Sequence, residues 1–303
     1  MKNKIFELKK AKNAIILAHY YTIPEVQDIA DFVGDSLALA KEAANTNADL
    51  IVFAGVHFMA ETAKILNPDK KVVIPDLQAG CSLADSCPAD QLKPFLTQYP
   101  DHLVLSYINC SAEVKALSDI IVTSGNALKI VQSLPENQKI VFTPDRNLGS
   151  YINKELNREM VLWDGACHVH DQLTADEVFK LKKQYPDAKV LAHPECKATI
   201  LALADFVGST AAMLKYTQED ANDEYIVATE TGILYEMQKR NPHKKFYVVN
   251  SSETCSCNDC EYMKLNSLSK IYNALLTETP EIILDNSLME KAKKPILRML
   301  ELS

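Results

Sequence analysis

Three segments of the chain decide its fold, because they align with one another without a gap: IILAHYYTIPEVQDIADFVGDS (15–36), LVLSYINCSAEVKALSDIIVTS (103–124) and KVLAHPECKATILALADFVGST (189–210). Equivalent positions at offsets of 88 and then 86 residues include His19, Tyr107 and His193; Asp31, Asp119 and Asp205; and Gly55, Thr143 and Thr229. Similarity at a fixed spacing indicates repetition of one structural unit. The sequence therefore predicts three copies of the same unit.

Short apolar runs alternate with helical stretches in each copy. Continuously apolar runs such as IIL, LVL and KVL are typical of buried parallel strands, and strands that alternate with helices form parallel sheets covered on both faces. We predict an α/β protein of three three-layer α/β/α units, related by a pseudo-threefold axis around a central site. The expected domains are residues 1–78, 79–165 and 166–260, with helices in 261–303 packing back on the first.

Composition excludes several classes of protein and site. The 303-residue chain has 47% apolar residues, a net charge of −8 and no long basic run, so nucleic acid is not an expected partner. No apolar stretch reaches about 18 residues, and the first residues, MKNKIFELKKAKN, lack a signal-peptide core. We expect no membrane association and a cytoplasmic location. The eight glycines form neither GxGxxG nor GxxxxGK, which argues against a Rossmann dinucleotide site or a P-loop.

Polar side chains follow the first strand of each copy, where parallel α/β sheets bind ligands. They form pairs two residues apart, which face the same way on extended backbone: His19 and Tyr21, Tyr107 and Asn109, and His193 and Glu195. Five residues after each aspartate, a hydroxyl at an expected helix start offers an anion cradle: Ser36, Ser124 and Thr210. The pattern predicts a site for a small molecule with two or three acidic groups.

Eight cysteines indicate metal or redox chemistry in a chain without a secretion signal. Cys81 lies 50 residues after Asp31 and Cys167 lies 48 after Asp119, whereas the third copy ends with Cys255, Cys257 and Cys260. One thiolate from each unit would suit an iron-sulfur cluster better than structural zinc, which usually takes four ligands in two close pairs. A [4Fe-4S] cluster held by three cysteines leaves one iron open to substrate as a Lewis acid.

The sequence resembles the quinolinate synthase family, the A proteins of de novo NAD biosynthesis in bacteria, over essentially its whole length. The motifs that carry the resemblance are ILAHYYTIPEVQDIADFVGDS, NPDKKVVIPD, FTPDRNLG, AHPEC, DFVGST, TETG and KAKKPILRML. The resemblance implies a condensing transferase that joins iminoaspartate (iminosuccinate) to dihydroxyacetone phosphate and releases quinolinate, phosphate and water. An L-aspartate oxidase or dehydrogenase is the implied functional partner.

The resemblance also implies roles for individual residues. The [4Fe-4S] ligands map onto Cys81, Cys167 and, through the context CEYMKLNSL, Cys260. The substrate-binding positions map onto His19, Ser36, Tyr107, Asn109, Ser124, His193, Glu195 and Thr210. Glu195 is the candidate general base and acid, with Tyr21 and Tyr107 as catalytic hydroxyl donors. The motif CxCxxC departs from the patterns of some relatives, which leaves Cys255 and Cys257 without an implied role.

Two alternatives differ from this interpretation in testable ways. An iron-sulfur hydro-lyase acting on another small polycarboxylate would need the same open iron but no phosphorylated substrate. A binding module stabilised by zinc would use CSCNDC as its metal site. Two observations also disagree on which cysteine of the third unit would bind the cluster. Repeat spacing favours Cys255, whereas the family context favours Cys260.

Overall fold

The computed structural model describes residues 1–250 and 258–303, and in this part of the chain the strands form three fully parallel four-stranded sheets. The first contains β1 (Ala14–His19), β2 (Phe32–Gly34), β3 (Leu50–Ala54) and β4 (Lys71–Val73) in the order β2-β1-β3-β4. The second contains β5 (Leu103–Tyr107), β6 (Ile120–Val122), β7 (Ile140–Thr143) and β8 (Val161–Leu162) in the order β6-β5-β7-β8. The third contains β9 (Lys189–Ala192), β10 (Phe206–Val207), β11 (Glu224–Ala228) and β12 (Lys245–Val248) in the order β10-β9-β11-β12.

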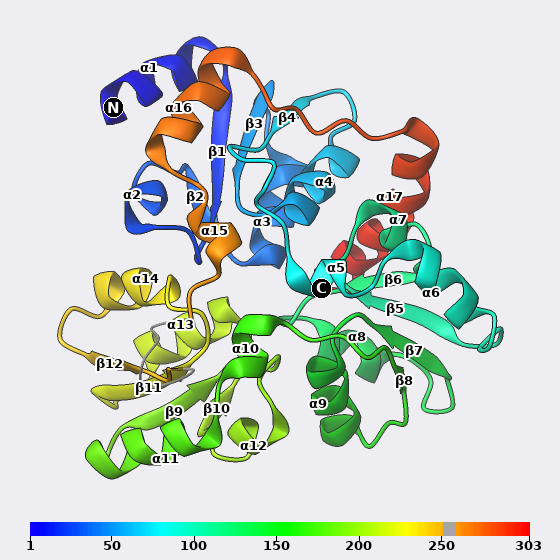
Figure 1. Ribbon diagram of the computed structural model, residues 1–303, viewed down its shortest axis with the longest axis vertical. Helices are drawn as coiled ribbons and strands as arrows, with labels where there is room; N and C mark the ends of the chain where they lie inside the picture. The colour runs from blue at the N-terminus through cyan, green and yellow to red at the C-terminus, as the bar shows by residue number, and fades with distance from the viewer. Residues whose placement is uncertain (251–257) are drawn as a thin grey trace.

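The three sheets also share their register. The equivalent pairs are Leu17 with Phe32, Leu105 with Ile120, and Leu191 with Phe206. Figure 1 shows the three units arranged around a common centre, with blue, green-cyan and yellow-green ribbons on different sides. The predicted α/β class and threefold repetition are confirmed.

Helices flank the strands of each unit. The first unit has α1 (Lys2–Ala11), α2 (Pro24–Gln27), α3 (Ser36–Asn45) and α4 (His57–Leu66). The second has α5 (Ser82–Asp85), α6 (Ala89–Leu96), α7 (Ala112–Lys115), α8 (Ala127–Ser133) and α9 (Arg146–Leu156). The third has α10 (His168–Gln172), α11 (Ala175–Gln184), α12 (Ala198–Leu201), α13 (Thr210–Glu219) and α14 (Ile233–Arg240). None of the helices in the described residues has the length and apolar character needed to cross a bilayer.

Strand β1 shows why the runs are continuously apolar. Leu17 belongs to the buried cluster that includes Leu39 of α3, whereas Ile16 belongs to a second cluster with Ile5 of α1. Successive residues of a strand point to opposite faces, so both faces of this sheet are packed against helices. The first unit is therefore the expected three-layer sandwich.

The repeated aspartate fastens two strands together in every unit. Its Oδ2 accepts a hydrogen bond, at 2.7–2.8 Å, from the backbone N–H of a residue 15 positions earlier in the first strand. Its own backbone N–H donates to the carbonyl of that same residue. The pairs are Asp31 with Ile16, Asp119 with Val104 and Asp205 with Val190. This doubly bonded contact, the aspartate brace, gives the landmark spacing a structural reason.

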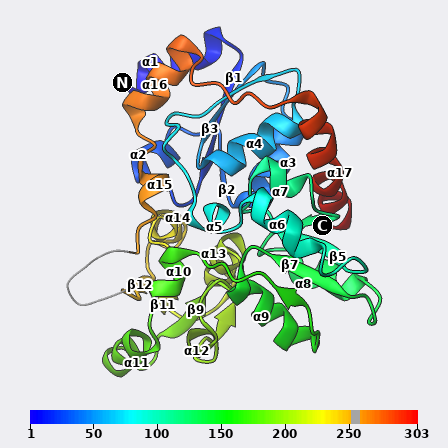
Figure 2. The same ribbon diagram turned by 45° about the vertical axis from the view of Figure 1, so that its right-hand side comes forward.

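The C-terminal helices are α15 (Glu261–Lys264), α16 (Leu268–Thr277) and α17 (Asn286–Leu302). Helix α16 packs on α1 and β3 of the first unit, but α17 packs mainly on α7 and β6 of the second and also touches α4. Both views show α16 beside α1 and α17 beside α7 (Figures 1 and 2). Ile296 and Met299 of α17 are fully buried in the apolar cluster that joins the first two units. Segment 261–303, expected on the first unit, is thus shared between two units, because its last helix has an apolar face that seals their junction.

Candidate active site

A cavity lies where the three units meet, and junctions between structural units are common places for small-molecule sites. Every candidate site residue predicted from the sequence lines it: His19, Tyr21, Ser36, Cys81, Tyr107, Asn109, Ser124, Cys167, His193, Glu195, Thr210 and Cys260. The carboxyl ends of β1, β5 and β9 supply the paired residues, as expected for parallel sheets. The structure brings these residues together, and their individual roles stay predictions.

The two histidines have the same local geometry in the first and third units. The backbone N–H of Tyr21 donates to His19 Nδ1 at 3.1 Å, and that of Glu195 donates to His193 Nδ1 at 3.3 Å. Burial lowers the pKa of both imidazoles to about 3, so both rings are neutral near pH 7. Because Nδ1 is the acceptor, the proton of each neutral ring sits on Nε2. Each histidine is therefore a neutral hydrogen-bond donor.

Two of the three predicted helix starts are present. Ser36 and Thr210 are the first residues of α3 and α13, and the caps are the preceding residues, Asp35 and Ser209, whose side chains accept backbone N–H bonds of the first turn. The hydroxyls of Ser36 and Thr210 are thus not needed as caps. They remain available to other partners at the cavity wall.

The third predicted helix start is wrong. Ser124 lies in a turn, and α8 begins only at Ala127 after the N-cap residue Asn126. The reason is a side-chain turn in which Asn126 Oδ1 accepts from the backbone N–H of Thr123 at 2.6 Å. Ser124 Oγ instead lies 3.2 Å from His193 Nε2, so a side chain of the second unit meets one of the third.

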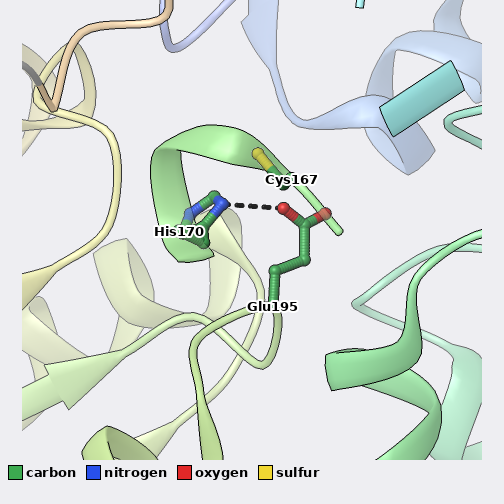
Figure 3. A group of neighbouring side chains, drawn as sticks. All are labelled: Cys167, His170 and Glu195. Carbon is green, nitrogen blue, oxygen red and sulfur yellow. Dashed lines mark ion pairs between the residues drawn. The ribbon is translucent and has the colours of Figure 1, made fainter. Parts of the chain in front are cut away.

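Glu195 sits in a buried polar cluster with His170, which the sequence analysis missed. Figure 3 shows the His170 ring facing the Glu195 carboxylate, with Nδ1 2.7 Å from Oε2. Burial acts to raise the pKa of Glu195, but His170 and then His193 outweigh it and lower that pKa to about 2. Glu195 is therefore ionised, as a general base must be. The available signal was position, because His170 follows Cys167 by three residues, about one helical turn.

The neighbouring unit holds the Glu195 loop in place. Asn147, at the start of α9, donates through Nδ2 to the Glu195 carbonyl at 3.0 Å and to Asp171 Oδ1 at 3.2 Å. The helix start is itself capped by Asp145, which accepts from the Leu148 N–H at 2.8 Å. These contacts give the motif FTPDRNLG a structural role in fixing the third unit against the second.

Both candidate tyrosines are neutral phenols. Burial raises the pKa of Tyr21 and of Tyr107 well above the ordinary value. The Tyr21 hydroxyl lies 2.9 Å from Thr210 Oγ1 and 2.9 Å from Thr229 Oγ1. A protonated phenol in a water-poor site can donate a hydrogen bond or a proton to a reacting oxygen.

The three candidate thiols occupy equivalent positions at the starts of short helices. Cys81, Cys167 and Cys260 are the N-cap residues of α5, α10 and α15. Backbone N–H groups of the following turn act to lower the pKa of each thiol, although none of the three side chains caps its helix with a hydrogen bond. Burial nevertheless raises the pKa to about 12 for Cys81, to about 11 for Cys260 and well above the usual value for Cys167. Thiolates at these positions would need a cation to stabilise them, which fits a thiolate-bound metal centre.

The third thiol is held by residues after β11. Glu230 accepts from the Cys260 N–H at 3.0 Å through Oε1 and from the Gly232 N–H at 2.7 Å through Oε2. A Cβ at Gly232 would lie only 2.6 Å from the Tyr21 Cα, so only glycine permits this approach of the third unit to the first. The motif TETG thus fixes the backbone at Cys260. Glu230 is a second residue that could not be identified from the sequence.

The other cysteines divide into two groups. Cys87, Cys110 and Cys196 are fully buried free thiols that do not line the cavity. Cys255 and Cys257 lie outside the described residues. A second set of metal-capable groups, Cys167, His170 and Glu195, has ligand atoms within 4.8 Å of one another and shares Cys167 with the three-thiol set. The three thiols are chemically uniform and come from three equivalent positions, whereas the second set combines three different ligand types.

Comparison with known proteins gives one consistent result. Residues 3–301 match the family described as "Quinolinate synthetase A protein". The chain is 58% identical over 300 residues to the quinolinate synthase of Thermosynechococcus vestitus, covering 99% of this chain and 94% of the relative. It is 57% identical over 301 residues to that of Chloroherpeton thalassium, with 99% and 94% covered, and 56% identical over 299 residues to that of Rippkaea orientalis, with 99% and 92% covered. A match of this extent and identity, together with a cavity lined by every expected residue, shows that the chain belongs to the quinolinate synthetase A protein family.

Proposed function

We propose that the protein condenses iminoaspartate with dihydroxyacetone phosphate to form quinolinate, phosphate and water, in de novo NAD biosynthesis. One observation carries the proposal. The twelve residues that the family resemblance implies, spread from His19 to Cys260, line a single cavity. Chance does not gather twelve positions from three units in one place.

The thiols of Cys81, Cys167 and Cys260 would hold a [4Fe-4S] cluster. Their unpaired state and their equivalent positions at the starts of three short helices support this ligand set. When bound, such a cluster supplies a Lewis acid at the iron that has no protein thiolate, which polarises a substrate oxygen.

The cavity wall offers matched donors for a dicarboxylate. The Nε2–H groups of His19 and His193 and the starts of α3 and α13 at Ser36 and Thr210 can each donate to a carboxylate oxygen. The Asn109 Oδ1 atom is a buried acceptor with no hydrogen-bond partner among the described residues. It is suited to the N–H of an imine or enamine.

Ring formation from these substrates requires repeated proton transfers, and three residues carry the required states. Glu195 is an ionised base, and the phenols of Tyr21 and Tyr107 are protonated acids. In this scheme Glu195 removes protons from substrate carbon or nitrogen. The phenols donate to leaving or developing oxygens.

The chemistry of iminoaspartate also defines its source. An imine of this kind hydrolyses in water, so an L-aspartate oxidase or dehydrogenase is proposed to supply it. We place the reaction in the cytoplasm, because the six described cysteines are all free thiols, as in reducing compartments.

Turnover of anaerobically reconstituted protein tests the proposal. Iminoaspartate and dihydroxyacetone phosphate should give quinolinate, and the protein should be brown with broad absorption near about 400 nm, the charge-transfer region of thiolate-bound iron. Brown protein that dehydrates another polycarboxylate but makes no quinolinate would indicate the hydro-lyase. Colourless protein containing zinc would indicate the binding module.

A further inference from the structure

Two buried ionisable side chains lie at the junction of the first and second units. Glu61 of α4 is 5% exposed, and Lys115, the last residue of α7, is fully buried. Neither residue lines the central cavity. Because burial of a carboxyl or an amine costs free energy unless the group gains partners, the contacts of these two side chains indicate what they do.

Both side chains bond the backbone of the loop that follows β5. Lys115 Nζ donates to the Cys110 carbonyl, and the Ala112 N–H donates to Glu61 Oε2 at 3.0 Å. The two bonded residues are two positions apart, and Asn109 directly precedes the first of them. A lysine of the second unit and a carboxyl of the first unit therefore fasten the same short segment.

Lys115 also contacts the first unit behind the cavity wall. Its Nζ lies 5.3 Å from the centre of the Phe58 ring, within the range of a cation–π interaction, and Phe58 lines the cavity. Burial raises the pKa of the Glu61 carboxyl, and the charge of Lys115 is the largest influence that opposes this rise. The lysine thus acts on two residues of α4 as well as on the loop.

Asn109 is the cavity residue whose place depends on this segment. Its Oδ1 is a buried acceptor without a hydrogen-bond partner among residues 1–250 and 258–303, and the residue lines the cavity. Such an acceptor is available to a ligand. Because no described residue accepts from or donates to Oδ1, the direction of the amide depends on the backbone that carries it.

We infer that Lys115 and Glu61 are positioning residues, which hold the backbone at Cys110 and Ala112 and thereby set the direction of the Asn109 amide. The inference deepens the proposed function and rests on it for the turnover assay, in which Asn109 accepts from the N–H of the imine or enamine. Misplacement of a group in an active site by about 1 Å can cost on the order of 100-fold in rate.

The chain offers a matched control on α4. Lys64 is 9% exposed, and its Nζ donates to the Lys70 carbonyl at 2.8 Å. Neither of these residues lines the cavity. Lys64→Met therefore removes a bond of the same kind, from a buried lysine to a carbonyl, at a place that does not involve the loop after β5.

The experiment measures kcat/KM for iminoaspartate in reconstituted Lys115→Met, Asn109→Ala and the variant with both substitutions. Lys115→Met should lower kcat/KM by about 10- to 100-fold, and Lys64→Met should stay within about 3-fold of wild type. Residues that act through one another do not have additive effects. Adding Lys115→Met to Asn109→Ala should therefore lower kcat/KM by less than about 3-fold more.

Glu61→Gln separates positioning from the balance of buried charge. The amide keeps an oxygen for the Ala112 N–H, so Lys115→Met combined with Glu61→Gln leaves no buried carboxylate without its lysine. The activity of this double variant should remain low, because the Cys110 carbonyl still lacks its donor. Urea unfolding checks that each variant folds, and the double variant takes the place of Lys115→Met if that protein does not.

Three results would overturn the inference. The first is wild-type kcat/KM in the double variant, which would assign the loss to charge balance. The second is full additivity of Lys115→Met and Asn109→Ala, which would show that the lysine acts on another group. The third is an unchanged Asn109 side chain in a crystal structure of the double variant. This last readout does not depend on turnover, whereas absence of quinolinate formation by the wild type would refute the proposed function separately.

Discussion

His193 Nε2 lies 3.2 Å from Ser124 Oγ, and this contact joins the third unit to the second across the cavity. Because a dicarboxylate at this place would accept from both groups, Ser124→Ala should weaken its binding by about 0.5–2 kcal/mol. Calorimetric titration with malate, a stable four-carbon dicarboxylate, measures the effect. Ser133→Ala, at the end of α8 and outside the cavity, is the control. Equal affinities in all three proteins would contradict a binding role.

Glu195→Gln should keep the fold and the bound iron but lose about 10²- to 10⁴-fold in turnover, because the amide preserves shape and cannot accept a proton as a base. Steady-state rates with iron analysis test this expectation. Glu155→Gln, an exposed carboxylate on α9, is the matched control. Wild-type turnover of the Glu195 variant would remove this residue from the mechanism.

Replacing the N-cap cysteines should abolish the cluster. Cys81→Ser, Cys167→Ser and Cys260→Ser should each fail to bind about four irons after anaerobic reconstitution, since one thiolate ligand is lost. Cys255→Ser and Cys257→Ser should bind iron as the wild type does. If Cys255→Ser lost the cluster while Cys260→Ser kept it, repeat spacing would be the better guide to the third ligand.

The ion pairs that Glu278 forms with Lys12 and Lys71 predict a free energy of unfolding that depends on pH. Glu278 binds Lys12 and Lys71 at 2.6 Å each, and these hydrogen bonds lower its pKa from 4.5 to about 2. A lowered carboxyl pKa adds stability above the unfolded value, and that stability is lost as the pH falls toward the folded value. Solvent screening limits the effect of Glu278→Gln to about 0.5 kcal/mol at pH 7.

Urea unfolding of both proteins at pH 7, 5 and about 3.5 measures this difference. The two curves should lie apart at pH 7 and at pH 5, and they should approach each other as Glu278 begins to protonate below its unfolded pKa. A difference that did not vary with pH would assign the stability to packing and not to charge.

Most of the fold could be predicted from the sequence, because residues with a local structural role recur at fixed spacings in the three repeats. The aspartate landmark is visible in the sequence since its brace depends on a fixed spacing of 15 residues. The paired residues after each strand were equally visible, because parallel strands end at one edge. All twelve candidate positions follow from such local rules or from the family resemblance.

The remaining features depend on contacts that no spacing encodes. The pairing of His170 with Glu195 depends on how α10 is rotated against the loop after β9. The position of Ser124 depends on the Asn126 turn, which delays α8 by three residues relative to the expected start. The packing of α17 depends on an apolar surface that exists only once the first two units have met.

The aspartate brace and the cavity differ in how many units they require. Each brace closes within one unit, and none borrows a residue from another copy. The brace therefore needs no contact between units. The cavity cannot be built in this way, because its wall draws on all three copies. The contacts that join the first strands are thus local to each unit, whereas the cavity exists only where the three units come together.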